Sequence, residues 1–213
     1  LVDNFTYDVD TREILSHTSR RQKLIEGLVE EALSLGADGI NVDFEQVPED
    51  AGEDYIEFLR ELSIPCRANG LVLSVDNYVP RNYNSHYHWK EQGVVADYVI
   101  IMGYDEHYGG SQETGSVASI GYVEEGISTM LQYVPAEKVI NAVPFYTRIW
   151  ETGAEGVKSQ AVGMTAAENF LSQRGIEPVW DEETCQNYAE FEEDGAFFQV
   201  WLEDEQSLRA KLQ

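Results

Sequence analysis

The stretch Asp38-Gly39-Ile40-Asn41-Val42-Asp43-Phe44-Glu45 alternates apolar and polar side chains over its last six residues. Because successive side chains of a β-strand point to opposite faces, the apolar set is expected on one face of a strand. The polar set, Asn41, Asp43 and Glu45, is expected on the other face. Burying three polar groups costs free energy unless they are hydrogen-bonded or carry chemistry. The stretch therefore predicts a strand with a functional polar face. The alternative is a purely structural polar face, whose groups only hydrogen-bond within the protein.

Two carboxylates, Asp43 and Glu45, stand two residues apart on this predicted face. Like charges at such a spacing repel, which raises the pKa of one of the two groups. A carboxylic acid that stays protonated near neutral pH can serve as a general acid. The pair therefore indicates acid–base chemistry. Asp38 has the opposite parity and is expected to be structural.

Strand-like and helix-like segments alternate around this strand and repeat at roughly 30 to 40 residues, as consecutive βα units do. The further strands are expected at residues 1–5, 71–75, 97–104 and 139–143. This order predicts a parallel sheet covered by helices. After Trp150 the pattern changes to short segments typical of antiparallel strands, which predicts a small α+β insertion over residues 151–200.

The composition excludes several classes of partner. The 213 residues include 14 Lys and Arg but 39 Asp and Glu, so the formal net charge is −25. Nucleic acids and anionic membrane surfaces are bound by cationic side chains, so neither is an expected partner. The most apolar run, residues 94–102, is interrupted by Asp97 and is too short to span a bilayer. A neutral or cationic partner is expected.

No metal or cofactor site is predicted. Cys66 and Cys185 could form one disulfide at most and are expected as two lone buried thiols. His86, His88 and His107 lack a carboxylate at ligand spacing, which favours loop histidines or sugar contacts over a metal site. The nucleophile elbow of serine hydrolases and the glycine-rich nucleotide-binding motifs are absent from the sequence.

The stretch DGINVDFE resembles the DxxDxDxE motif of glycoside hydrolase family 18, the chitinase-like (β/α)8 barrels, with Asn41 in place of the more usual Asp. Met102-Gly103-Tyr104-Asp105 resembles the MxYD at the end of the family's sixth strand. VPFYTRIW, residues 143–150, resembles the end of the seventh. The NxDFE spelling, EHYGG after MGYD and VWLEDEQS near the end are closest to the branch of spore and cell-wall lytic N-acetylglucosaminidases.

The resemblance implies a role for each matched residue. Glu45 would protonate the glycosidic oxygen, and the sugar's own 2-acetamido group would act as nucleophile, because this family is substrate-assisted and retaining. Asp43 would orient the acetamide N–H, and Tyr104 would donate to the acetamido oxygen. Further substrate contacts are expected at seven positions: Asn41, Asn77, Tyr78, Met102, Asp105, Tyr146 and Trp150.

The resemblance also implies a (β/α)8 TIM barrel that is incomplete over residues 1–213. Strands three to seven would be present, strands one, two and eight absent, and the insertion would follow strand seven. A fragment of a longer protein, partner chains that supply the missing elements, and an open sheet all fit this count. The exposed edges of such a barrel would favour self-association.

The expected function is retaining hydrolysis of β-1,4-linked N-acetylglucosamine glycans, with peptidoglycan of the spore cortex or cell wall as the substrate. Alternatives are a chitinase, an endo-N-acetylglucosaminidase of N-glycans, a lectin-like relative without activity, and a chain inactive because it is incomplete. The expected partner is an amino-sugar polysaccharide or oligosaccharide. The resemblance places the protein outside a bacterial cell, in its envelope or on its spore.

Overall fold

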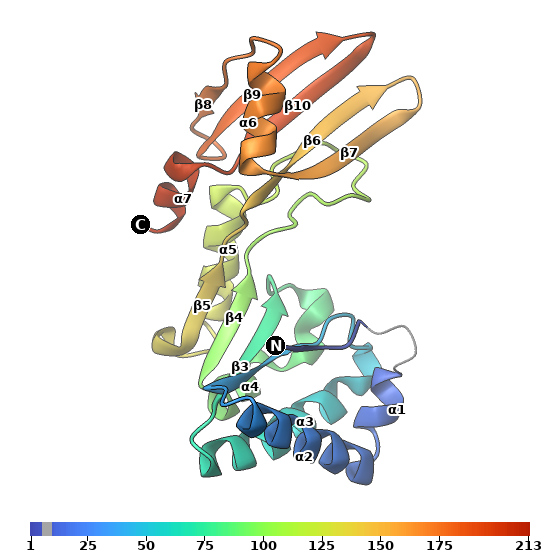
Figure 1. Ribbon diagram of the computed structural model, residues 1–213, viewed down its shortest axis with the longest axis vertical. Helices are drawn as coiled ribbons and strands as arrows, with labels where there is room; N and C mark the ends of the chain where they lie inside the picture. Colours follow the sequence, from blue (N-terminus) through green and yellow to red (C-terminus); the bar gives the residue numbers. More distant parts are fainter. Residues whose placement is uncertain (6–9) are drawn as a thin grey trace. The chain divides into compact units, whose positions relative to one another are not determined.

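A five-stranded sheet and a second, antiparallel sheet account for the strands of the computed structural model, which describes residues 1–5 and 10–213 (Figure 1). The chain divides into two compact units. Unit 1 comprises Leu1–Met102 and Gly126–Asn141, and unit 2 comprises Gly103–Glu125 and Ala142–Gln213.

The sheet of unit 1 contains strands in their sequence order: β1 (Val2–Asp3), β2 (Gly39–Asp43), β3 (Val72–Tyr78), β4 (Tyr98–Met102) and β5 (Val139–Ala142). Strands β1 to β4 pair in parallel. A Cβ atom on Gly39 would lie 2.3 Å from the Val72 carbonyl oxygen, so glycine permits the close pairing at the start of β2. The predicted parallel sheet is confirmed.

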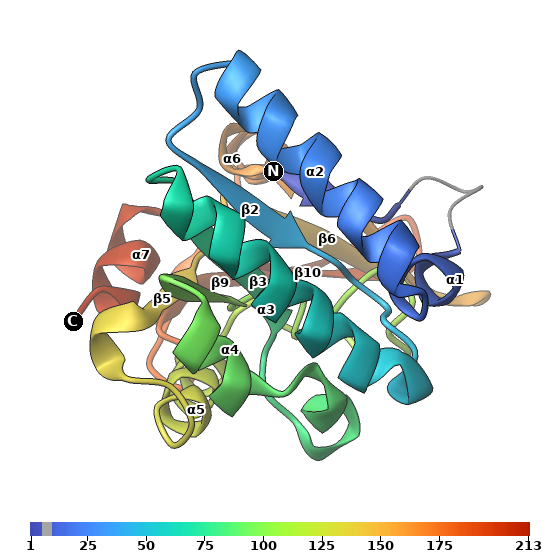
Figure 2. The same cartoon turned by 90° about the horizontal axis from the view of Figure 1, so that it is seen from below.

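Helices lie between these strands: α1 (Thr11–Leu15), α2 (Thr18–Ser34), α3 (Gly52–Ala68), α4 (Trp89–Val95) and α5 (Ile120–Met130). Short 3₁₀ turns complete the connections: η1 (Glu49–Ala51), η2 (Asn82–Tyr87) and η3 (Ala136–Lys138). Helix α2 packs on β2 and helix α3 on β3, and Figure 2 shows the two helices side by side over the sheet.

The helix-covered face of the sheet is apolar. Its strand residues are almost completely buried: Ile40, Val42, Leu73, Val75, Val99 and Ile101. Phe44, just after β2, stacks on Phe58 of α3 with ring centroids 5.5 Å apart. Burial of such side chains stabilises a fold by about 1.5–3 kcal/mol each. This face therefore anchors β2 and β3, and their alternate residues are left to the other face.

Unit 2 contains an antiparallel sheet in the order β7-β6-β10-β9-β8. Its elements are β6 (Tyr146–Gly153), β7 (Gly156–Gly163), α6 (Met164–Ser172), β8 (Val179–Asp181), β9 (Gln186–Glu193), β10 (Ala196–Leu202) and α7 (Glu205–Lys211). Helix α6 packs on β6, β7 and β10. The expected short strands correspond to β8, β9 and β10. The hairpin of β6 and β7 was not predicted.

Helices that could cross a bilayer are not found in the part of the chain that the structure describes. Both cysteines are free, Cys66 buried and Cys185 half-buried. Burial raises the pKa of the Cys66 thiol to about 11.

Candidate active site

Glu45 lies two residues beyond the end of β2 and is held at both its backbone and its carboxylate. The side-chain amide of Asn4 donates to the Glu45 carbonyl oxygen at 2.8 Å, and the Glu45 N–H donates back to Asn4 Oδ1 at 2.9 Å. The Tyr78 hydroxyl donates to Glu45 Oε2 at 2.5 Å. Burial and this bond both raise the pKa of Tyr78. The carboxylate that the motif identified is therefore oriented by a neighbouring strand.

The turn after Glu45 is fixed by a buried tyrosine. The Tyr87 hydroxyl donates to the Phe44 carbonyl oxygen at 3.3 Å and accepts from the Val47 N–H at 3.1 Å. Between them, Gln46 adopts a left-handed conformation with φ of 52°, which is uncommon for a residue other than glycine. The chain thus reverses immediately after Glu45, and the two bonds of Tyr87 stabilise that reversal.

Asp43 is the carboxylate with the strongly raised pKa. Its pKa is raised to about 6, first by burial and then by the negative charges of Asp76, Glu45 and Asp3. Its Oδ1 atom is buried, and none of the residues that the structure describes donates a hydrogen bond to it. The sequence predicted a raised pKa through repulsion within the pair, whereas burial is the larger cause. An unpartnered buried oxygen is costly, so it is a candidate acceptor for a ligand N–H.

Asn41 contacts β3 rather than Asp43. Its amide donates to Ser74 Oγ at 3.0 Å and to Asp76 Oδ1 at 3.2 Å. Asp76 is half-buried, and burial raises its pKa while the bond from Asn41 lowers it. Sequence reasoning missed Asp76 and Asn4. The signal for Asp76 was the alternation of Ser74, Asp76 and Tyr78 along β3, in step with that of β2.

The structure separates the two neighbours Asn77 and Tyr78, both of which were expected to contact the substrate. Asn77 is 1% exposed, and its amide exchanges hydrogen bonds of 2.7 and 3.0 Å with Gln92 of α4. Asn77 therefore belongs to the helix-covered face, where Gln92 and not a sugar satisfies its amide. Met102 of β4 is half-buried and pairs in register with Tyr78.

A second cluster lies within unit 2. The Tyr146 hydroxyl donates to the exposed Asp105 carboxylate, and the Tyr104 and Tyr146 rings meet edge-on with centroids 6.3 Å apart. Burial, together with the bond to Asp105, raises the pKa of Tyr146. The Tyr122 hydroxyl donates to the Tyr104 carbonyl oxygen at 3.4 Å. The structure thus brings Tyr104, Asp105 and Tyr146 together.

Trp150 does not fit its expected role. It is 1% exposed, and its indole N–H donates to the Gly115 carbonyl oxygen at 2.8 Å. A sugar ring stacks on an accessible aromatic face, which this side chain does not offer. The structure therefore places Trp150 in the core of unit 2, without the accessible ring face that the predicted substrate contact requires.

The histidines are engaged in structural contacts. His86 Nε2 lies 2.9 Å from the Val47 carbonyl oxygen, and His107 Nδ1 lies 2.8 Å from that of Ser116. His88 Nε2 lies 3.4 Å from the Glu53 carboxylate. Across the described residues, groups of three or more His, Cys, Asp or Glu side chains suited to a metal ion are not found.

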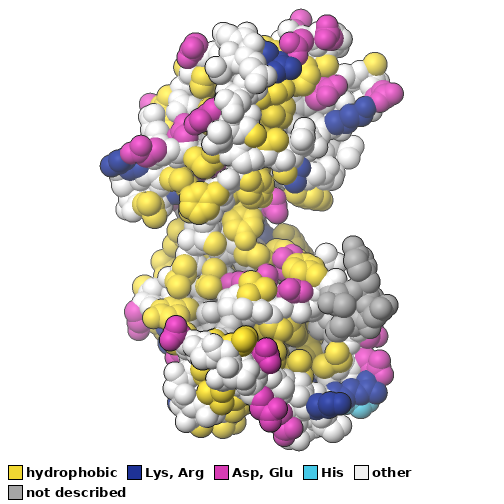
Figure 3. Space-filling view, viewed as in Figure 1, with side chains coloured by type: hydrophobic (Ala, Val, Ile, Leu, Met, Phe, Trp, Pro, Cys, Tyr) yellow, Lys and Arg dark blue, Asp and Glu magenta, His cyan; other side chains and the backbone are white. Residues whose placement is uncertain are grey.

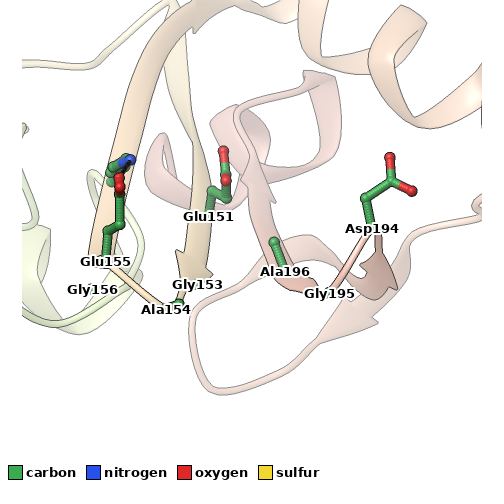
Figure 4. Close-up of a pocket in the computed structure, with 9 residues that line it drawn as sticks. Glu151, Gly153, Ala154, Glu155, Gly156, Asp194, Gly195 and Ala196 are labelled. Carbon is green, nitrogen blue, oxygen red and sulfur yellow. Dashed lines mark hydrogen bonds and ion pairs between the residues drawn. The ribbon is translucent and has the colours of Figure 1, made fainter.

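One surface pocket of about 260 Å³ lies at the tips of two hairpins of unit 2, between Gly153–Gly156 and Asp194–Ala196 (Figure 4). Lys158, which lines it, is paired with Glu155 at 2.5 Å, and the lining includes no predicted site residue. Acidic side chains outnumber basic ones on the visible face of each unit, in line with the net charge (Figure 3). Neither feature points to a site.

The arrangement in unit 1 can carry out acid–base chemistry. Glu45 is held by a hydroxyl donor, and Asp43 stands two residues earlier with a buried open acceptor. A carboxyl group so placed can donate a proton to a bound oxygen, and its neighbour can accept an N–H or stabilise a developing positive charge.

Comparisons with known proteins agree with this chemistry. The family model described as glycosyl hydrolases family 18 matches residues 10–213. YdhD of Bacillus subtilis, named a sporulation-specific glycosylase, is 28% identical over 209 residues, which cover 94% of this chain and 49% of YdhD. A cortical fragment-lytic enzyme of Bacillus anthracis is 27% identical over 219 residues, which cover 98% of this chain and 50% of that enzyme. The chain spans about half the length of the curated relatives it matches.

Solved structures share the fold. The crystal structure of YdhD from Bacillus subtilis superposes with a TM-score of 0.90 at 26% identity, over 99% of this chain and 73% of that one. A chitinase from Chromobacterium violaceum superposes with a TM-score of 0.86 at 24% identity, over 97% of this chain and 67% of that one. The chitinase shows likeness of fold alone.

Proposed function

Because the chain belongs to glycosyl hydrolase family 18, we propose that it hydrolyses β-1,4-linked N-acetylglucosamine glycans with retention of configuration. The observation that supports this most strongly is the carboxylate pair of β2. The Tyr78 hydroxyl donates to Glu45 Oε2 at 2.5 Å, and Asp43 presents a buried oxygen that has no hydrogen-bond partner among residues 1–5 and 10–213. A purely structural polar face would hydrogen-bond all of its own polar groups, whereas the described residues leave Asp43 Oδ1 open as an acceptor for a ligand.

Glu45 is the proposed general acid. It gives its proton to the glycosidic oxygen while the acetamido carbonyl oxygen attacks the anomeric carbon, so the glycosidic bond breaks and an oxazolinium ion forms. Glu45, now a carboxylate, then takes a proton from the water that attacks the same carbon, while the bond between that carbon and the oxazolinium oxygen breaks and the acetamido group is restored. Two displacements on one carbon give net retention. The Tyr78 bond keeps the carboxylate oriented through both steps.

Asp43 is proposed to act in its ionised form. Its open oxygen accepts the acetamide N–H, which turns the carbonyl toward the anomeric carbon and stabilises the positive charge that develops on the group. Asn41 contributes through its contact with Asp76. The motif resemblance alone supports three further roles: Tyr104 donates to the acetamido oxygen, and Met102 and Asp105 line the subsite of that group. Tyr146 is proposed as a sugar contact that also orients Asp105.

The five strands β1 to β5 are proposed to correspond to strands three to seven of the family's (β/α)8 barrel, with residues 151–200 as the insertion after strand seven. The one-by-one spatial order of the five strands supports this. Strands β1 and β5 are the two edges of the sheet, and self-association through them is part of the proposal. Sedimentation analysis of the purified chain measures it directly.

Peptidoglycan of the spore cortex or cell wall is the proposed substrate, which places the protein outside the cell or on the spore. The names of YdhD and the cortical fragment-lytic enzymes support this choice. Chitin is the second candidate, because chitinases share the fold. A lectin-like role is less well supported, because the chain keeps Asp43 and Glu45 in the motif.

Release of chromophore from an aryl N,N′-diacetylchitobioside tests the proposal. Glu45→Gln is expected to lower the rate at least about a hundredfold, because general acid catalysis contributes about 10²–10⁴-fold. Glu49→Gln, at an exposed glutamate four residues later, is the matched control and keeps the wild-type rate. Equal rates for wild type and Glu45→Gln contradict the proposal. Mass spectrometry of digests of cortex peptidoglycan and of chitin then identifies the substrate.

A further inference from the structure

Carboxylates of three neighbouring strands lie in line on the polar face of unit 1. The register pairs Asp3 of β1 with Asp43 of β2. It pairs Val42 of β2 with Val75 of β3, so the next residues along, Asp43 and Asp76, are also neighbours. Adjacent strands lie roughly 4.8 Å apart, and side chains in register leave the same face together. Asp43 is therefore flanked by a carboxylate on each side.

We propose that Asp76 is a positioning residue, which pairs with Asp43 across β2 and β3 and governs the protonation state in which Asp43 meets the substrate. Asp76 can have this role only if the proposed function holds, because that function requires an ionised Asp43 beside the acetamide. Sequence comparison by motif would not find Asp76, which lies outside DGINVDFE.

Asn41 fixes Asp76 in this place. Its amide donates to Asp76 Oδ1 at 3.2 Å and to Ser74 Oγ at 3.0 Å, so it bridges the two strands just before the carboxylate pair. An amide cannot share a proton as an acid, so Asn41 does not itself hold a proton for Asp43. The carboxylate next to Asp43 on this side is that of Asp76, supplied from the neighbouring strand.

The surroundings of Asp43 explain why a second carboxylate matters. Asp43 Oδ1 is buried with no hydrogen-bond partner in the described part of the chain, where the charged groups that act on Asp43 are Asp76, Glu45 and Asp3. Two partly buried carboxylates on adjacent strands cannot both ionise freely, so the pair titrates as a unit that retains a proton to higher pH. Burial raises the pKa of both groups, that of Asp43 to about 6.

Other titratable groups near the pair act in smaller ways. Burial raises the pKa of Tyr55 and that of Tyr87 above the ordinary value, and the charge of Asp43 raises both further. Asp3 is exposed, so water and salt screen its charge from Asp43. Among the neighbouring charges, that of Asp76 raises the pKa of Asp43 most, ahead of those of Glu45 and Asp3.

The experiment is a titration of the Asp43 carboxyl carbon by NMR in the 213-residue chain, compared between wild type, Asp76→Asn and Asp3→Asn. Asp76→Asn keeps the shape and an oxygen that accepts from Asn41 but removes the charge. We expect it to lower the pKa of Asp43 by about one unit. Asp3→Asn removes an equal charge at an exposed position and is expected to change the pKa of Asp43 much less. Circular dichroism checks folding, and Asp76→Ser is the second variant.

The pH profile of kcat/KM for the aryl chitobioside is the second measurement. Activity rises with pH as Asp43 ionises, so Asp76→Asn is expected to move the acidic limb to lower pH by the same amount as the NMR titration. An Asp43 titration that is unchanged in Asp76→Asn and Asp76→Ser, or that shifts equally in Asp3→Asn, overturns the inference. If the wild-type chain cleaves nothing, the proposed function fails, and the titration still decides whether Asp76 governs Asp43.

Discussion

Asn77 and Tyr78 are neighbours on β3, yet their polar groups have opposite surroundings. Asn77 faces the helices, where Gln92 satisfies its amide in a buried pair. Tyr78 faces away from them and donates its hydroxyl to Glu45. On the helix-covered face, the polar side chain of Asn77 hydrogen-bonds within the protein and has a structural role. On the other face, the polar side chains are arranged around the Glu45 carboxylate, as acid–base catalysis requires.

Val42 and Asp43 repeat this contrast on β2. Val42 is completely buried against the helices, whereas Asp43 keeps a buried oxygen to which no described residue donates a hydrogen bond. The first contributes free energy to folding and the second costs it. The apolar face of the sheet thus holds in place a polar face that would not be stable by itself, and substitutions on the two faces should have different consequences.

The largest effect is expected from Asp43→Asn, which breaks the chemistry of the polar face. The variant keeps the shape of the side chain but lacks the charge that stabilises the acetamide, so kcat should fall by about 10²–10³-fold. Its free energy of unfolding at pH 7 should equal or exceed that of the wild type, because the variant removes the negative charge from a half-buried carboxylate whose Oδ1 atom is buried. A destabilised variant with unchanged kcat would reverse the assignment of the two faces.

The next largest effect is expected from Leu73→Ala on the apolar face. Leu73 is 1% exposed, so the variant leaves a cavity and should lose about 2–5 kcal/mol of unfolding free energy in urea titrations. Ser74→Ala, at the next residue on the polar face, is the matched comparison and should lose less than about 1 kcal/mol. Similar losses for the two variants would show that the faces do not differ in this way.

A smaller effect should separate Asn77 from Tyr78. Asn77→Ala leaves the buried amide of Gln92 without its partner and should cost about 1–3 kcal/mol of stability. Its kcat, measured per folded molecule, should stay at the wild-type value. Tyr78→Phe removes only the donor to Glu45, so it should change stability little and lower kcat about fivefold, which corresponds to the net free energy of one hydrogen bond. An activity loss confined to Asn77→Ala would contradict the structure.

The smallest effect concerns the pH dependence of stability. The pKa of Asp43 is raised from 3.8 to about 6 in the folded chain, so between these values the folded chain holds a proton that the unfolded chain has released. Raising the pH across this window therefore lowers the free energy of unfolding. Between pH 4 and 6, the slope of the free energy of unfolding against pH should be less negative in Asp43→Asn than in the wild type. Urea titrations of both proteins over this range measure the two slopes. Equal slopes would show that Asp43 titrates normally.

Much of the polar face could be predicted from the sequence, because strand alternation is local. The spacing of Asn41, Asp43 and Glu45 predicted their common face. The same rule would have separated Asn77 from Tyr78, since adjacent strand residues cannot face the same way. Their joint assignment to the site rested on their position at the strand end alone.

The rest depends on contacts between residues distant in sequence. Asp76 meets Asn41 through the register of two strands 35 residues apart, and Asn4 reaches Glu45 across 41 residues. The burial of Trp150 depends on the carbonyl group of Gly115. Strand β7 carries mostly exposed side chains, so it lacks the apolar alternation that identifies a strand.

The most direct test of the central claim compares two aryl disaccharides that differ at the 2-position of the sugar, the N,N′-diacetylchitobioside and the cellobioside. If the sugar's acetamido group is the nucleophile and Glu45 the acid, the wild-type chain should cleave the first at least about a thousandfold faster, because an intramolecular nucleophile is lost in the second. Glu45→Gln should abolish most of that difference. Comparable rates for the two glycosides in the wild-type chain would contradict the account.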